Sequence, residues 1–251
     1  MGCPERYHGV VMHALGWAAW KTYLGRPEES ELRGCAFNML GLGLFEANHL
    51  EDALSVQEAE LAMRLRSGAS EEMILGLQSN IADTYKHLGD HEKALSMDRD
   101  VYFGNVKLYG EEHEQTIRMA LNYGTLLGQL NRFEEAKLLL RKFIPAARRV
   151  LGENHGRTLK IRWAYADALF GDPSATLDDL REAVATLEET ERTARRVFGN
   201  SHPTVLDIGE DLKSSREALA RLGEDSDKAA IMAIAFVAAL AFFVGRRYLR
   251  R

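Results

Sequence analysis

A repeat of about 42 residues is the feature that most constrains how this chain of 251 residues can fold. A glycine recurs at equivalent positions that are 43, 42, 42 and 47 residues apart: Gly25, Gly68, Gly110, Gly152 and Gly199. A histidine lies three residues after each of the last three glycines: His113, His155 and His202. A unit of this length is too small to bury an apolar core alone, so we expect neighbouring units to stack. Because the histidines recur once per unit, we predict a structural role for them and no shared metal ion.

Apolar residues recur at helical spacing within each unit. One segment carries Ile74, Leu77, Ile81, Tyr85 and Leu88, and another carries Phe133, Ala136, Leu140 and Phe143. The breaks between such segments are short and polar, as at Gly89-Asp90 and Asn131-Arg132, which favours tight antiparallel helix pairs. We find no run of alternating β-branched residues bounded by hairpin turns. The pattern therefore predicts an all-α fold.

These residues resemble the tetratricopeptide repeat, and the 42-residue period with its Gly-x-x-His element is similar to the kinesin-light-chain type of that repeat. Ala82 falls on the small helix-packing position of the family, and Tyr85, Gly89 and Ala94 fall on its aromatic, turn-glycine and second small positions. The resemblance implies a right-handed α-solenoid of stacked antiparallel helix pairs. It places the repeats over residues 26–224, after a partial helical unit at 1–25, and it is strongest from 69 to 152.

The resemblance also implies a working surface, namely a concave groove that is lined by the first helix of each pair and binds a protein or peptide segment. In the family an asparagine of the first helix hydrogen-bonds the backbone of the bound peptide, and Asn80 and Asn122 occupy that position. An amide can both donate and accept, so it can satisfy a peptide unit of any sequence. The same frame places further side chains in the groove: Ser79, Asp83, Lys86, His87, Arg118, Thr125 and Gln129. It continues into the next unit with Lys160 and Trp163.

Two questions about this groove stay open in the sequence. The asparagines either contact a ligand or bond only within the solenoid. The charges are mixed, because Lys86, Arg118 and Lys160 favour an acidic peptide whereas Asp83 and Asp167 oppose one.

The C-terminal segment differs from the repeats. Residues 229–244 carry no polar side chain, and Gly245 and an arginine-rich end follow them. As a helix, residues 229–245 would span roughly 25 Å, close to the lower limit for a bilayer crossing. We predict that residues 225–251 form a hydrophobic helix with a basic tail, which anchors a cytosolic repeat domain to an organelle membrane. By analogy that membrane is the mitochondrial outer membrane or the peroxisome. The alternative is a helix that caps the solenoid, but a cap needs a polar outer face.

Composition excludes several classes of function. The chain is 46% hydrophobic and 27% charged, which excludes disorder as its main state. Its two cysteines cannot form a disulfide framework, which favours a reducing compartment. Outside residues 229–251 there are 28 basic and 37 acidic side chains, which argues against a nucleic-acid partner.

No catalytic, cofactor-binding or metal-binding pattern occurs, so the sequence predicts no enzyme and no cofactor. The main hypothesis is therefore a membrane-anchored adaptor that binds peptide segments. The alternative is a soluble, cytoplasmic cargo adaptor similar to a kinesin light chain, and the remote alternative is an enzyme or the regulatory arm of one. The sequence sets neither the partner nor the oligomeric state.

Overall fold

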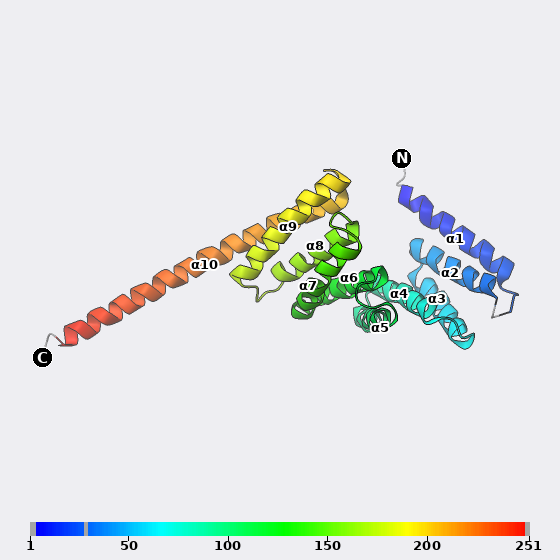
Figure 1. Cartoon of the computed structure of the whole chain (residues 1–251), viewed down its shortest axis with the longest axis horizontal. Coiled ribbons are helices and arrows are strands. Elements are labelled where there is room, and N and C mark those ends of the chain that lie inside the picture. The colour runs from blue at the N-terminus through cyan, green and yellow to red at the C-terminus, as the bar shows by residue number, and fades with distance from the viewer. Residues whose placement is uncertain (1–3, 28–29, 249–251) are drawn as a thin grey trace. The chain divides into compact units, whose positions relative to one another are not determined.

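The structure, a computed structural model, describes residues 4–27 and 30–248, and every regular element within these ranges is an α-helix (Figure 1). The helices fall into two compact units, Met1–Leu130 and Asn131–Arg251. The N-terminal unit contains α1 (Pro4–Tyr23), α2 (Glu31–Glu46), α3 (Leu50–Arg66), α4 (Glu71–Leu88), α5 (His91–Tyr109) and α6 (Glu114–Gln129). The C-terminal unit contains α7 (Phe133–Val150), α8 (Gly156–Phe170), α9 (Leu177–Phe198) and α10 (Pro203–Tyr248). The predicted all-α class is confirmed for the described residues.

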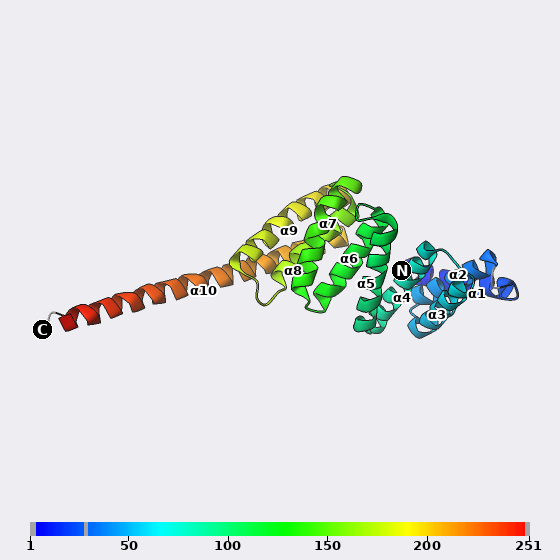
Figure 2. The ribbon, with the colours of Figure 1, turned by 60° about the horizontal axis from the view of Figure 1, so that its bottom comes forward.

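Within each unit, every helix packs against the next one along the chain, as predicted for stacked helix pairs (Figure 2). The small residues that were expected to permit close packing, Ala82 and Ala94, are fully buried. Ala82 lies on α4 and Ala94 on α5, so they mark the contact between the two helices of one repeat. The handedness of the superhelix stays a prediction.

The repeated Gly-x-x-His element ends one helix and begins the next. The repeated glycines have positive φ angles of 69°, 83°, 96° and 86°, a backbone conformation that other residues adopt only with strain: Gly68, Gly110, Gly152 and Gly199. Each repeated histidine precedes a helix, and its Nδ1 accepts a hydrogen bond of 3.2 Å from the backbone N–H two residues later: His113, His155 and His202. The histidines therefore cap helices, which confirms the structural role predicted for them.

The first two helices approach each other unusually closely. A Cβ atom added to Gly43 on α2 would lie 2.5 Å from the backbone oxygen of Met12 on α1, and one added to Gly16 would lie 2.8 Å from Cα of Leu40. Only residues without a side chain allow this backbone contact. Gly41 and Gly43, which could suggest a nucleotide-binding loop, are instead packing positions of α2: Gly43 faces α1, and Gly41 faces Gln57 of α3.

In the C-terminal unit the loop between α8 and α9 spans residues 171–176. Asp172 in this loop accepts hydrogen bonds from the backbone N–H and the hydroxyl of Ser174, at 2.8 and 2.7 Å. These bonds, helped by Lys137 Nζ at 3.0 Å, lower the pKa of Asp172 to about 2.

Pro145 lies inside α7, which continues to Val150.

The last helix departs from the predicted organisation. α10 runs without a break across the boundary predicted between residues 224 and 225, because Gly223 and the charged residues after it form no turn signal (Figure 1). A glycine inside a helix costs only about 1 kcal/mol. In both views α10 continues past the ends of α8 and α9.

The predicted membrane span gains no support. Among the residues that the structure describes, no helix is long and apolar enough to cross a bilayer. Most side chains of the predicted span, residues 229–245, lie outside the described ones.

α10 also closes the packing of its unit. Counted from the capping histidine, Lys213 on α10 stands where Gly124 and Ala166 stand on α6 and α8. Those two small residues are buried, whereas Lys213 is exposed. A second helix could not pack closely over a lysine at this position. The position on α10 that corresponds to the small helix-packing residue is therefore polar.

Candidate functional site

Apart from Lys160 and Trp163 on α8, the residues predicted to line the groove lie on α4 and α6, which are the first helices of their repeats and both pack against α5. We call the outward side of these two helices the first-helix face of the N-terminal unit. Asn80 on α4 and Asn122 on α6 are 42 residues apart and half-buried. Neither side chain hydrogen-bonds to another of the described residues. Both amides thus keep their donors and acceptors for another molecule.

The prediction that Ser79 lines the groove is wrong. Its residue surface is only 4% exposed, so it faces the interior and not the groove. Ser79 follows the buried Leu75 by four residues and precedes the buried Ala82 by three, which places all three on the packed side of α4. The one-residue offset from Asn80 is enough to turn a side chain by 100° around a helix.

Lys86 is already engaged by carboxylates of its own unit. Its Nζ lies 2.5 Å from Oδ1 of Asp83 on the same helix and 3.4 Å from Oδ2 of Asp98 on α5. Asp98 is 2% exposed, and burial raises its pKa although the ammonium of Lys86 opposes the shift. The positive charge of Lys86 therefore stabilises a buried carboxylate, and little of it remains for an acidic ligand.

The remaining predicted residues differ in exposure. His87 is exposed at the end of α4, where its Nδ1 lies 2.9 Å from the backbone oxygen of Asp83 and its ring meets Phe45 edge-on at 4.8 Å. Arg118 is half-buried on α6, where it already interacts with other residues of the chain. Thr125 and Gln129 are exposed on the same helix. The structure thus gathers Asn80, Asn122, Thr125 and Gln129 as the accessible polar groups of the face.

The C-terminal unit has an equivalent face, formed by its first helices α8 and α10. Nε1 of Trp163 on α8 donates a hydrogen bond of 2.6 Å to Oδ2 of Asp211 on α10. Asp211 lies nine residues after His202, as Asn122 lies nine residues after His113, so a carboxylate replaces the repeated amide here. The spacing from the histidine is visible in the sequence, so this replacement is predictable from it.

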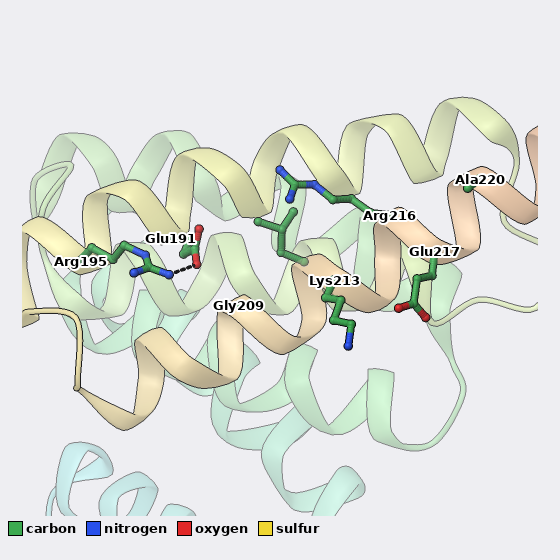
Figure 3. A pocket seen from close by; sticks show the side chains of 8 residues that line it. Glu191, Arg195, Gly209, Lys213, Arg216, Glu217 and Ala220 are labelled. Atoms are coloured by element: carbon green, nitrogen blue, oxygen red, sulfur yellow. Dashed lines mark hydrogen bonds and ion pairs between the residues drawn. The ribbon is translucent and has the colours of Figure 1, made fainter.

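A shallow hollow of about 520 Å³ lies between α9 and α10 (Figure 3). Charged side chains of both signs line it, and they are largely paired. Arg195 binds Glu191 at 2.7 Å, and Arg216 binds Glu188 of α9 at 2.7 Å. The first pair joins two residues of α9 that are four positions apart, whereas the second joins α10 to α9. The pair of Arg216 with Glu188 stabilises the packing of α9 and α10.

The described residues contain no cluster of three or more histidine, cysteine, aspartate or glutamate side chains that could hold a metal ion. The hydrogen bonds and ion pairs at the two faces suit recognition of another chain. Their donors and acceptors are spread along helices and do not converge on one reacting atom.

Comparison with known proteins agrees with this geometry. Residues 73–148 match the model of the tetratricopeptide repeat family. The crystal structure of BtubC (BKLC) from P. vanneervenii covers 94% of this chain and 93% of its own, with a TM-score of 0.65 and 14% sequence identity. The crystal structure of a putative kinesin light chain from Podosopora anserina, with nearly identical TPR-like repeats, covers 79% of this chain and 99% of its own, with a TM-score of 0.60 and 16% identity.

No curated protein matches the sequence. At identities of 14% and 16% the similarity to the two crystal structures concerns the fold. The family model matches the segment in which the predicted resemblance is strongest, and the similarity of fold extends over nearly all of the chain. Residues 73–148 thus match the tetratricopeptide repeat, and the chain shares the fold of the two crystal structures.

Proposed function

We propose that this protein is an interaction adaptor that binds a segment of a partner protein along the first-helix face of its N-terminal unit. The observation that supports the proposal is the state of Asn80 and Asn122. Each amide is reachable from solvent and has no hydrogen-bonding partner among the described residues. Their equivalent positions on successive first helices suit a chain whose peptide groups present donors and acceptors at regular intervals.

Two features favour an adaptor over an enzyme. The polar groups of the face lie on rigid helices of neighbouring repeats, which provide an extended recognition surface. The ion pairs of Lys86 hold this surface in place, since they tie α4 to α5. Such a surface can bind a peptide without reorganisation, which reduces the entropy lost on binding.

We favour an adaptor that needs no membrane attachment, as in the cargo-adaptor hypothesis. One structural relative is a putative kinesin light chain, and no described helix supports the anchor. The exposed thiol of Cys35 is consistent with a reducing compartment such as the cytosol.

A display selection of random peptides on the full chain, followed by affinity measurement, tests the proposal. The double variant Asn80→Ala with Asn122→Ala should weaken the selected peptides roughly tenfold or more, because each lost hydrogen bond contributes about 0.5–1.5 kcal/mol. Asn154→Ala with Asn200→Ala is the matched control, since both of these asparagines are exposed in loops of the other unit. Circular dichroism should show equal helicity for all three proteins. Equal affinities for the wild type and the first double variant would remove the asparagines from the binding site.

A further inference from the structure

We propose that the first-helix face of the C-terminal unit binds a lysine- or arginine-rich segment of the partner. This inference rests on the proposed function and adds a partner chemistry to it. The surface in question lies on α8 and α10, and four carboxylates gather there: Asp167, Asp207, Glu210 and Asp211. We call them the acidic face.

Two members of the acidic face lie at positions equivalent to those proposed to bind the partner in the N-terminal unit. Asp211 replaces the repeated asparagine, and Asp167 stands where Thr125 stands on α6, twelve residues after the capping histidine. Asp167, Asp207 and Glu210 are exposed, and Asp211 is half-buried. The first-helix face therefore carries amides in the N-terminal unit, whereas the acidic face carries carboxylates at the equivalent positions.

The carboxylates of the acidic face lack counter-charges within the described part of the chain. None of the four forms an ion pair there. Lys160 on α8 and Lys213 on α10 are exposed and form no ion pair with a described residue either, but their two charges do not balance four. By contrast, Lys86 of the other unit is held by two aspartates. The net charge of the face therefore favours a cationic partner.

The direction of the pKa shifts of two carboxylates in the acidic face agrees with a cationic partner. Partial burial raises the pKa of Asp167, and the neighbouring Asp211 raises it further. Partial burial likewise raises the pKa of Asp211; the hydrogen bond from Trp163 opposes this shift, whereas Asp207 and Glu210 add to it. A bound ammonium or guanidinium group would relieve the repulsion among these carboxylates.

Trp163 gives the face a second property that suits such a partner. Its hydrogen bond to Asp211 fixes the indole beside the carboxylates, and the side chain is partly exposed. An indole ring attracts lysine and arginine side chains through its π-electrons and also contacts their methylene groups. The combination of a fixed aromatic ring and unbalanced carboxylates distinguishes a basic peptide from a neutral one.

Fluorescence anisotropy of the full chain with two labelled peptides tests this inference. One probe is a 12-residue peptide of alternating lysine and alanine, and the other has glutamate in place of lysine. We expect the lysine peptide to bind and the glutamate peptide not to bind. The variant Asp167→Asn with Asp211→Asn should weaken the lysine peptide about tenfold, and raised salt should weaken it further.

The matched control is Asp178→Asn with Glu224→Gln, which removes the same charge from exposed ion pairs of the same unit. It should change the affinity less than twofold. An equal loss in both variants would show attraction to the net charge of the protein and overturn the inference.

The outcomes separate this inference from the proposed function. If the lysine peptide fails to bind while selected peptides still depend on Asn80 and Asn122, only the acidic face loses its role. If the lysine peptide binds through Asp167 and Asp211 while the asparagine variant binds every selected peptide normally, the proposed role of the N-terminal unit is wrong.

Discussion

Nη2 of Arg162 on α8 lies 2.5 Å from Oε2 of Glu189 on α9, so a buried guanidinium joins the two helices of one repeat. Arg162 is only 2% exposed, and Glu153 provides a second carboxylate at 3.4 Å. Burial lowers the pKa of Arg162, and Glu189 opposes this shift. The charge of Arg162 is therefore tolerated inside the unit because its two partners reach it from the surface.

Removing one of these partners should destabilise the C-terminal unit. We expect Glu189→Gln to lower the free energy of unfolding by about 1–3 kcal/mol, since the buried guanidinium loses its shortest contact. Asp178→Asn is the control, because the ion pair of Asp178 with Arg181 is exposed and should contribute less than about 0.5 kcal/mol. Urea denaturation of both variants provides the comparison. Similar effects of the two substitutions would contradict a stabilising role for the buried pair.

A second buried charge predicts how stability depends on pH. Glu60 on α3 is 2% exposed, and burial raises its pKa to about 7, although Arg64 and the side chain of Asn38 oppose the shift. Arg64 lies 3.8 Å from Glu60 and also binds Glu31 of α2 at 3.3 Å. The protonated form of Glu60 is thus favoured in the folded state at a pH where the unfolded chain has lost that proton.

The sign follows from the two pKa values. The contribution of Glu60 to stability is fully present below its ordinary pKa of 4.5 and is lost as the pH rises to about 7. Over this range the free energy of unfolding should fall by roughly 2–3 kcal/mol more in the wild type than in Glu60→Gln, which cannot titrate. Urea denaturation at several pH values between these limits measures the difference. Parallel pH profiles for the two proteins would show that Glu60 is ionised throughout.

The sequence predicts the repeats well because their determinants are local. The glycines and histidines of the Gly-x-x-His element act within one turn of the chain, so their period is visible without tertiary information. Ion pairs between helices are not visible in this way. The run from Glu188 to Glu191 suggests partners four residues onward, yet Glu188 and Glu189 bind arginines of other helices, because the rotation of α9 directs them there.

The sequence pattern also does not predict which polar residues lie on packed helix faces. Ser79 and Glu60 lie on sides of α4 and α3 that apolar periodicity alone does not assign to the interior. The sequence predicts the positions of Asn80 and Asn122 on the first helices. That their side chains lack internal partners follows only from the placement of the neighbouring helices.

The capping histidines give a prediction about local stability. His155→Ala should lower the free energy of unfolding by about 1 kcal/mol, because the backbone N–H of Arg157 loses its acceptor at the start of α8. His155→Asn should restore most of this loss, since asparagine is a favoured residue before a helix. Thermal denaturation followed by circular dichroism compares the three proteins. An alanine variant as stable as the wild type would show that solvent replaces the cap without loss.

The close contact of α1 and α2 makes a sharper prediction. Gly43→Ala places a methyl group 2.5 Å from the backbone oxygen of Met12, so the two helices must separate. We expect a loss of about 1–3 kcal/mol, as for other overpacked contacts, together with faster proteolysis of α1. Gly76→Ala on α4 is the matched control, because nothing lies within 4 Å of its added methyl group. This control should be neutral or stabilise the protein by up to about 1 kcal/mol, since alanine favours a helix more than glycine does. If both substitutions stabilise the chain, α1 does not pack on α2 at the distance seen here, and the role of glycine in this contact is wrong.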